Sequence, residues 1–414
     1  MHILFISQQW WPEHGVIQHR MNWLVEGLYK RGHTVSVVTS PPHSPNGKLL
    51  STDPEHLKGS RSVGPNGELI YRTGFREYTN HLASRLIDQT VQMAGAIPAI
   101  KRAIDDKTPD LIVATAPPIP AVINAFIAHQ KFSIPYVIDL RDAWPDNDRY
   151  IAYTDPSMPK PSWTRHTGAL ALRSLAPIYA QAIQQSDGLI TTSHTHSSEL
   201  CARWGLRTLA VRNLAGLDLN RAPLPQRVPS DDTLRVLYMG NIGRAQGLHH
   251  LPDAMGILKK RNVPVHLRLQ GRGAHIHYIR QQASAKGLNI EVRNPIPSSE
   301  IQKVYEQADT LLVSLENWDS LEMTIPSKLF ETMLTGRHIT CIARGAAAKI
   351  VTEAKAGDVV NPGDAEGLAD LWTRLQANRE LLDTKGQGRA WLATNAQPDS
   401  ELEAAIDFLE ATIE

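Results

Sequence analysis

Residues 326–336 contain a cation and a carboxylate at a spacing that places both on one face of a helix. At about 100° per residue, the polar side chains share one side: Lys328, Glu331, Thr332 and Thr335. The apolar side chains share the other: Leu329, Phe330, Met333 and Leu334. The helix dipole disfavours a lysine in the first turn, so its presence there favours a bound anion, usually phosphate. Glu331 can accept hydrogen bonds from ribose hydroxyls. An ordinary surface helix with a charged face is the alternative explanation.

Both ends of this predicted helix have suitable residues. Thr324 or Ser327 can cap the start, and Pro326 suits the opening turn. Gly336 suits the left-handed residue just past the end. The segment therefore predicts a helix that presents Lys328 close to its positive end.

A second candidate for phosphate binding lies at residues 240–248, after a predicted strand and before a helix. Gly240 and Gly243 have no Cβ and allow close approach of the backbone, and Arg244 offers a permanently charged, bidentate guanidinium. A tight turn with a solvated arginine explains these residues equally well. The spacing matches neither the P-loop nor the dinucleotide fingerprint, which weakens interpretations as an ATPase or a dehydrogenase.

Two loops of the first half also follow predicted strands. Three residues of the loop at 10–15 are candidates for ligand contact: Glu13, His14 and Gly15. The glycine precedes a helix, where the backbone can approach a phosphate. Arg141 and Asp142 follow the strand predicted at 136–140 and can orient an acceptor hydroxyl or a reacting sugar. A purely structural ion pair between Arg141 and Asp142 is an equally good explanation.

Other groupings resemble metal sites but lack part of what such sites need. Asp146 and Asp148 have the spacing of a divalent-metal motif, but no apolar strand leads into them, which favours a solvated loop. Three pairs of histidines lie close together in sequence: His194 and His196, His249 and His250, and His275 and His277. No pair comes with the acidic or thiol neighbours of a tight site, so we expect surface and turn histidines and no metal site.

Short runs rich in Ile, Val and Leu alternate with helical stretches, which is typical of parallel strands covered by helices on both faces. The strands predicted in the first half are 3–7, 34–40, 111–115, 136–140, 188–192 and 209–212, with a helix at 19–31. Those predicted in the second half are 234–239, 265–270, 290–293, 310–315, 338–342 and 358–360. The fold class predicted is α/β, with two doubly wound parallel sheets.

A polar, proline-bearing stretch separates the two series of strands. We predict a first domain at 1–220, a linker at 221–232, a second domain at 233–397 and a terminal helix, 398–414, that crosses back to the first domain. Ligands of open parallel sheets bind at the carboxyl ends of the strands. Two such domains that face each other would define a deep interdomain cleft.

The bulk properties narrow the function classes. A chain of 414 residues exceeds what one hydrophobic core usually organises, and a net charge of +1 gives no electrostatic reason to expect a nucleic acid partner. Two cysteines far apart, Cys201 and Cys341, suggest reduced thiols and a cytoplasmic protein. We find no signal peptide and no apolar run of about eighteen residues. Residues 71–102 mix apolar and basic side chains, so either peripheral membrane attachment or packing on its own domain explains them.

Together, these motifs resemble the retaining family-4 glycosyltransferases of the GT-B fold, especially the bacterial branch that builds surface polysaccharides. Six segments match the family in order, over almost the whole length: 11–15, 32–39, 141–146, 213–218, 240–248 and 326–336. The resemblance implies two Rossmann-like domains, a nucleoside-diphosphate sugar as donor, a hydroxyl acceptor and retention of anomeric configuration. It implies neither a metal nor another cofactor, because cations and helix dipoles can stabilise the departing diphosphate.

The resemblance also implies roles for particular residues. The implied donor-binding residues are Gly15, Gly240, Asn241, Gly243, Arg244, Lys328, Leu329 and Glu331. The implied catalytic residues are Arg244, Lys328 and Asp142. The candidates on the acceptor and sugar side are Glu13, His14, Arg141, Asp142 and Glu322. Arg244 and Lys328 would hold the diphosphate, and Glu331 would bind the ribose.

The sequence departs from the family pattern at three positions. The family's first glutamate lies eight residues before the helix glutamate, where this chain has Met323. Glu322 and Asp319 are nearby, so the group that contacts the donor sugar is not fixed by the pattern. Arg141 stands where many members have a histidine, and Gln246 lies near the position of a frequent lysine.

We therefore expect a cytoplasmic glycosyltransferase, free or peripheral on the inner face of the membrane, in polysaccharide, glycoconjugate or natural-product biosynthesis. A nucleotide-sugar epimerase of the same shape is one alternative, and it would need paired carboxylates such as Asp142 and Glu322 for proton abstraction. A non-catalytic nucleotide-sugar binding protein is another. The nucleotide base, the sugar, the acceptor and the oligomeric state are not predicted.

Overall fold

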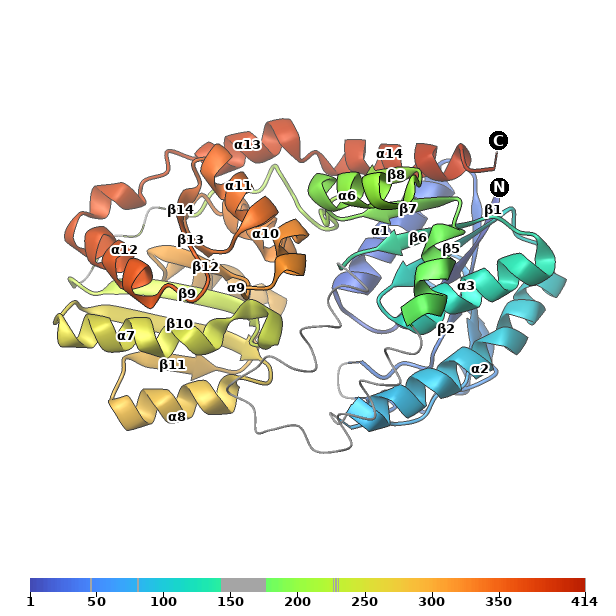
Figure 1. Ribbon diagram of the computed structural model, residues 1–414, viewed down its shortest axis with the longest axis horizontal. Coiled ribbons are helices and arrows are strands. Elements are labelled where there is room, and N and C mark those ends of the chain that lie inside the picture. The colour runs from blue at the N-terminus through green and yellow to red at the C-terminus, as the bar shows by residue number, and fades with distance from the viewer. Residues whose placement is uncertain are drawn as a thin grey trace. The chain divides into compact units, whose positions relative to one another are not determined.

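The computed structural model describes residues 1–44, 47–79, 82–142, 176–225, 227, 229 and 231–413 (Figure 1). These residues form two α/β units, each with its own sheet and core. The first contains the described residues up to Gly216 together with those from Pro398 onward, and the second contains the described residues of 217–397. The predicted fold class of two α/β domains with parallel sheets is confirmed.

The first unit is built on a sheet of eight strands in the order β3-β4-β2-β1-β5-β6-β7-β8. The strands are β1 His2–Ile6, β2 Thr34–Thr39, β3 Arg61–Val63, β4 Leu69–Arg72, β5 Leu111–Ala116, β6 Tyr136–Leu140, β7 Gly188–Thr191 and β8 Thr208–Ala210. The labelled helices of this unit are α1 Val16–Lys30, α2 Leu82–Asp106, α3 Ile119–Phe132, α6 His194–Trp204 and α14 Pro398–Glu410. All paired strands run parallel except β3 and β4.

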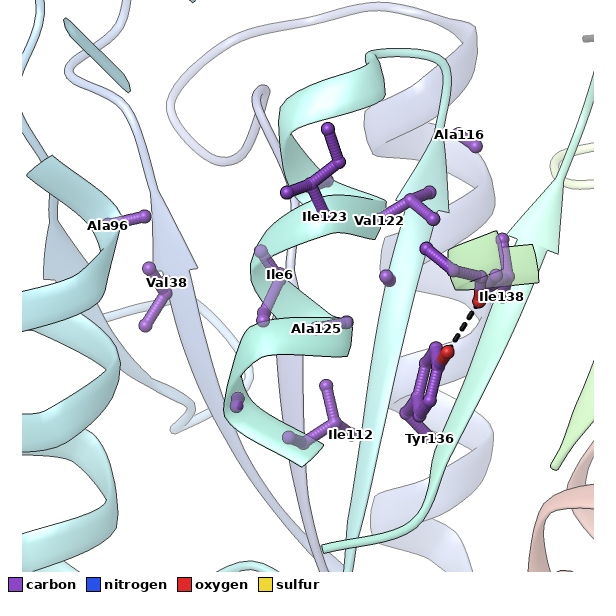
Figure 2. Close-up of a cluster of buried hydrophobic side chains, with 14 of the residues drawn as sticks. Ile6, Val38, Ala96, Ile112, Ala116, Val122, Ile123, Ala125, Tyr136 and Ile138 are labelled. Atoms are coloured by element: carbon purple, nitrogen blue, oxygen red, sulfur yellow. Dashed lines mark hydrogen bonds between the residues drawn. The ribbon is translucent and has the colours of Figure 1, made fainter. Parts of the chain in front are cut away.

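The core of the first unit lies on both faces of its sheet. Along β1 the side chains alternate, with Leu4 and Ile6 in one buried cluster and Ile3 and Phe5 in the other. The first cluster packs against α2 and α3, as Figure 2 shows for Val122 of α3 beside the strands. The second packs against α1 and α14. Because both faces are covered, the central strands are largely apolar, which is why their sequences predicted them well.

The second unit repeats this design with six parallel strands in the order β11-β10-β9-β12-β13-β14. The strands are β9 Leu234–Asn241, β10 Val265–Arg272, β11 Ile290–Arg293, β12 Thr310–Ser314, β13 His338–Ile342 and β14 Gly357–Val360. The α-helices are α7 Leu251–Lys260, α8 Ile276–Lys286, α9 Ser298–Glu306, α10 Ser327–Leu334, α11 Gly345–Glu353, α12 Ala365–Ala377 and α13 Gln387–Asn395. Short 3₁₀ turns lie at Arg244–Gln246, Leu248–His250 and Asp319–Met323.

A fully buried tryptophan stands in the core of the second unit. Trp372 of α12 is 0% exposed, and its indole N–H donates to the Thr340 hydroxyl of β13 at 3.3 Å. This bond satisfies the polar end of a large apolar side chain, so its burial carries no desolvation penalty for the N–H.

Most predicted elements are confirmed, with ends shifted by up to four residues. The helix predicted at 19–31 begins at Val16, and the strand predicted at 234–239 continues to Asn241. Gly240 and Asn241 therefore belong to β9 and pair with β10, whereas we expected them in the loop. No sequence pattern predicts the β3–β4 hairpin, because its strands are short and Arg61, Ser62 and Arg72 interrupt the apolar pattern.

The strand order of each sheet reverses at one place. In the first unit β2 and β5 flank β1, and in the second β10 and β12 flank β9. At such a reversal the connections leave the strands toward opposite faces, and a crevice opens at the carboxyl ends. The switch points therefore lie between β1 and β5 and between β9 and β12.

Candidate functional site

The loop after β9 forms a tight turn held by its own hydrogen bonds. The Gly243 N–H donates to the Gln246 side-chain oxygen at 3.1 Å, and the Asn241 side-chain amide donates to the same oxygen at 3.3 Å. Gly247 closes the turn at a φ of 61°, a left-handed conformation that favours glycine. Arg244, in the middle of this turn, is half-buried. The turn thus fixes the backbone at the switch point of the second sheet.

The same turn is joined to the chain that leaves β12. The Glu316 N–H donates to the Ala245 carbonyl at 2.8 Å, and the Ser314 hydroxyl donates to the Gln246 carbonyl at 2.6 Å. A Cβ on Gly247 would lie 3.2 Å from the Glu316 Cα. The loop after β9 and the segment after β12 therefore form one structure at the carboxyl ends of two adjacent strands.

Helix α10 follows that segment and places Lys328 in its first turn, as predicted. Its apolar face is buried, with Leu329, Phe330, Met333 and Leu334 between 0% and 7% exposed. The Lys328 ammonium lies 2.7 Å from a Glu331 carboxylate oxygen, and both side chains reach solvent, 38% and 45% exposed. The two residues predicted to contact the diphosphate and the ribose thus pair with each other in this structure.

Two details of the predicted helix are wrong. Thr332 and Thr335 are buried, and their hydroxyls donate to the Leu329 and Thr332 carbonyls, because short polar side chains in a helix readily bond the preceding turn. The polar face is therefore narrower than predicted. The helix begins at Ser327, and in the described residues no side chain caps its start, contrary to our expectation for Thr324 or Ser327. Gly336 has a φ of 76°, which confirms the predicted left-handed residue past the end.

Glu322 lies in the 3₁₀ turn before α10 and is paired with a residue that the sequence analysis missed. Its carboxylate is 2.5 Å from the Arg344 guanidinium, which also contacts Asp319 at 3.2 Å. Arg344 follows β13 at its carboxyl end. A search for charged residues directly after predicted strands, which identified Arg244, would therefore also have identified Arg344. Gly345 allows the approach, since a Cβ there would lie 2.1 Å from the Glu322 carbonyl oxygen.

In the first unit Glu13 is part of the framework. Its carboxylate is 3% exposed and accepts the N–H groups of His43, Ser44 and Trp10 at 2.8, 2.6 and 3.2 Å. These bonds hold the loop after β1 against the loop after β2. Both oxygens of the Glu13 carboxylate therefore already accept backbone hydrogen bonds. His14 is exposed. Gly15 precedes α1, and no atom of the described chain lies within 4 Å of the place of a Cβ, so a ligand has room there.

Arg141 and Asp142 follow β6 and differ in environment. Arg141 is 9% exposed, donates to the Pro117 carbonyl at 2.7 Å and lies 3.9 Å from Asp139. Burial lowers the pKa of its guanidinium. The side chain of Asp142 is exposed. Arg141 therefore holds the end of β6 to the end of β5, and Asp142 is the group of the two that solvent reaches.

A buried ion pair that sequence reasoning missed connects α1 to β6. The Arg20 guanidinium donates to both Asp139 oxygens, the closest at 2.8 Å, and to the Val211 and Arg212 carbonyls at 3.0 and 3.2 Å. It also reaches the Asn213 side chain at 3.1 Å. One arginine of α1 thereby connects this helix to β6 and to the chain after β8. The sequence pattern predicts α1 as an ordinary helix and indicates no partner for Arg20.

A small pocket opens at the switch point of the first sheet. Its polar lining is Ser7, Gln8, Ser40, Thr73, Gln92 and Asn124. Asn124 is 2% exposed, and its side-chain oxygen accepts no hydrogen bond within the described residues. A buried amide oxygen without a donor can accept a hydroxyl from a ligand.

Part of the predicted site lies outside the described residues. This applies to 143–146 of the motif after β6, to Asp146 and Asp148, and to positions 226, 228 and 230 of the predicted linker. In the described part of the chain, every helix is too short or too polar to traverse a bilayer.

Comparisons with known families identify two matching models. The model described as glycosyl transferase 4-like domain matches residues 15–213, and that described as glycosyl transferases group 1 matches residues 222–388. No curated protein sequence matches the chain.

Solved structures similar to this one have two-domain folds of the same kind. Sucrose-phosphate synthase from Thermosynechococcus elongatus superposes with a TM-score of 0.73 at 17% identity, over 99% of this chain and 98% of that one. Anabaena HepE in complex with UDP-glucose gives 0.61 at 16% identity, over 99% and 100%. WaaG, described as a glycosyltransferase involved in lipopolysaccharide biosynthesis, gives 0.61 at 13% identity, over 98% and 99%.

Proposed function

Because the chain belongs to the glycosyltransferases of the GT-B fold, we propose that it moves a sugar from a nucleoside diphosphate to an acceptor hydroxyl with retention of anomeric configuration. The observation that supports this most directly is the pair Lys328 and Glu331, presented on α10 at the carboxyl edge of the second sheet. The Arg244 turn stands at the same edge, after the neighbouring strand β9. Two cations and a carboxylate are the groups that a diphosphate and a ribose require.

Donor binding would separate the pair on α10. An exposed ion pair one turn apart stabilises a helix by only about 0.2–0.5 kcal/mol, so a diphosphate can replace Glu331 as the partner of Lys328 at little cost. Glu331 is then available to accept ribose hydroxyls. Arg244 would contact the diphosphate from the turn at 240–247, and the backbone of Gly240, Asn241, Gly243 and Leu329 lies at the same edge.

The chemical step that fits these groups requires no protein nucleophile. The bond from the anomeric carbon to the diphosphate breaks, and a bond from the same face of that carbon to the acceptor oxygen forms. The acceptor's proton passes to an oxygen of the leaving diphosphate. Arg244 and Lys328 would stabilise the negative charge on that diphosphate, in the manner of preorganised electrostatic catalysis. We propose that the reaction itself is metal-independent.

We further propose a uridine nucleotide as the donor base and surface-polysaccharide assembly as the biosynthetic setting. Both proposals draw on related structures, because Anabaena HepE has been solved with UDP and with UDP-glucose, and WaaG acts in lipopolysaccharide biosynthesis. For the acceptor we propose the pocket around Asn124 and the exposed Asp142 in the first unit. Ile87 and Ile97 of α2 are 49% and 43% exposed, and this helix is our candidate for peripheral contact with a membrane.

Lys328→Ala tests the proposed donor site. We expect turnover with a UDP-sugar to fall at least about a hundredfold, because a cation aimed at developing charge contributes roughly 3 kcal/mol. The fold should persist, since the lysine side chain is partly exposed. Lys349→Ala, on the exposed face of α11, is the matched control and should keep wild-type turnover.

Three outcomes would contradict the proposal. Wild-type turnover in Lys328→Ala would show that Lys328 of α10 is not part of the donor site. Conversion of the donor sugar to an epimer without acceptor would identify an epimerase. Tight UDP-sugar binding with no transfer to any hydroxyl acceptor of a broad panel would identify a binding protein.

A further inference from the structure

The structure gives one histidine pair the acidic neighbour that the sequence did not reveal. His249 and His250 form a 3₁₀ turn directly after the Arg244 turn, and Glu316 follows β12 on the adjacent strand. His250 and Glu316 are 66 positions apart, so the sequence does not reveal that they are close. Our expectation that no acidic group accompanies these histidines is therefore wrong.

The three side chains converge within bonding range of a single ion. The His249 Nδ1 lies 3.6 Å from one Glu316 oxygen, and the His250 Nε2 lies 3.5 Å from the other. All three potential ligand atoms lie within 4.8 Å of one another. Ligands bonded at about 2.0–2.2 Å to one tetrahedral Zn²⁺ are roughly 3.2–3.6 Å apart, so small side-chain adjustments suffice.

The positions of these ligands are fixed by the surrounding structure. The backbone N–H of Glu316 donates to the Ala245 carbonyl at 2.8 Å, and the Asn317 N–H donates to a Glu316 carboxylate oxygen at 2.8 Å. The ring of His249 packs edge-on against His275, with centroids 4.9 Å apart. A ligating carboxylate that also accepts a backbone hydrogen bond, as Glu316 does from Asn317, is typical of metal sites.

We propose that His249, His250 and Glu316 bind one divalent first-row transition metal ion, of the Zn²⁺ type. Two imidazoles and one carboxylate favour Zn²⁺, Co²⁺ or Ni²⁺ over Mg²⁺ and Ca²⁺, which prefer oxygen ligands alone. His249 is buried, whereas His250 is partly exposed and lines a small pocket with Gly247, Leu315, Asn361 and Asp364. Solvent therefore reaches the cluster from the side of His250. Three protein ligands leave the fourth position of a tetrahedral ion for water.

The proposed ion would be structural. It would join the turn after β9 to the segment after β12, the same two segments that Glu316 and Ser314 already connect by hydrogen bonds. It is independent of the proposed transfer reaction, because neither Lys328 nor Arg244 is among its ligands.

Calorimetric titration of the chelator-stripped full chain with Zn²⁺ tests the inference. We expect one strongly bound ion per chain, a visible absorption band of the tetrahedral type with Co²⁺, and a higher melting temperature with Zn²⁺ but not with Mg²⁺. Glu316→Gln and His250→Ala should each weaken Zn²⁺ binding by at least about tenfold, the loss known for removal of outer contacts alone.

His277→Ala is the matched control, because this histidine is exposed on α8 and outside the cluster. It should bind Zn²⁺ as the wild type does. The far-UV circular dichroism of the metal-free variants shows whether each has folded, and Glu316→Gln keeps the side-chain volume. Wild-type Zn²⁺ affinity in both folded ligand variants, or no stoichiometric Zn²⁺ binding by the wild type, would overturn the inference and leave a histidine–carboxylate contact that only supports the fold.

Discussion

At the scale of single residues, the three-residue spacing of Lys328 and Glu331 lets the two side chains pair with each other and, as we propose, bind a nucleotide instead. In the structure they form an ion pair, and a bound nucleotide would recruit each to a different group. The exposure of both side chains makes this exchange possible, since a buried pair would lose several kcal/mol on separation. The short helix α10 therefore presents the proposed ligand groups without depending on their pairing for its own stability.

Glu331→Ala should remove discrimination for the ribose hydroxyls. Hydrogen bonds to a charged acceptor contribute about 1.5–3 kcal/mol, so the wild type should bind UDP about tenfold or more tighter than its 2′,3′-dideoxy analogue. The variant should bind the two nucleotides equally. Calorimetry with both ligands measures the difference, and Glu353→Ala on α11 is the control. Unchanged preference for UDP in Glu331→Ala would show that another group contacts the ribose.

Residue types and spacing predicted these two groups because they lie on one helix, where geometry is local. Glu316 and Arg344 illustrate the opposite case. Each follows a strand, and each acquires its partner only when separate strands become neighbours in the sheet. Glu13 was predicted as a ligand group because it stands in a loop after a strand, but three backbone N–H groups occupy its carboxylate. Whether a loop carboxylate is free depends on backbone paths that a sequence pattern does not contain.

At the scale of elements, the sequence predicted the strands but not the side-chain contacts between elements. Continuous apolar runs identify strands that are covered on both faces, which is why all twelve predicted strands exist within a few residues. The short β3 and β4 at the sheet edge have no such runs. The pair Arg20 and Asp139 connects α1 to β6 across 119 residues and looks like two unrelated charges in the sequence.

Asp139→Asn should destabilise the first unit by about 3–5 kcal/mol. The substitution leaves the Arg20 guanidinium buried without a counter-charge, and an uncompensated buried charge has that cost. Urea denaturation, followed by a signal from the first unit, measures the loss. Asp105→Asn is the control, because its pair with Lys101 is more than half exposed and should contribute below about 1 kcal/mol. Equal effects of the two substitutions would show that the buried pair has no special role.

At the scale of the whole molecule, the acid sensitivity of the first unit should depend on His2. This histidine is 5% exposed between Thr34 and Ser36, and burial, followed by the charge of Lys107, lowers its pKa to about 4. Between about pH 6.5 and 4 the unfolded chain therefore binds the proton that the folded chain does not, so stability falls as the pH falls through this window.

The size of this effect is measurable. A shift from 6.5 to about 4 corresponds to a loss of up to about 3 kcal/mol at the acid end. His2→Gln, which does not titrate, should show a shallower decrease in unfolding free energy between pH 6.5 and 4. Denaturation curves at several pH values compare the two proteins. Parallel pH profiles for the wild type and His2→Gln would contradict the assignment of this acid sensitivity to His2.

Each unit has its own core, so a ligand of one unit can be located by where it protects the backbone. The donor groups we propose all belong to the second unit: Arg244, Lys328 and Glu331. Amide hydrogens exchange with solvent when a segment opens locally. A bound ligand slows exchange in the segments that cannot open while it is bound.

We therefore expect UDP to slow hydrogen exchange in residues 240–247 and in α10, and to leave α1 and α2 of the first unit unchanged. Exchange followed by mass spectrometry resolves these segments. Lys328→Ala should reduce the protection at both places in the second unit together, because loss of affinity releases the whole nucleotide rather than one contact. Protection centred on the first unit would show that the donor binds there, which would reverse the assignment of donor and acceptor domains. Protection of the second unit that persists in Lys328→Ala would support donor binding by that unit but would show that Lys328 does not contribute to it.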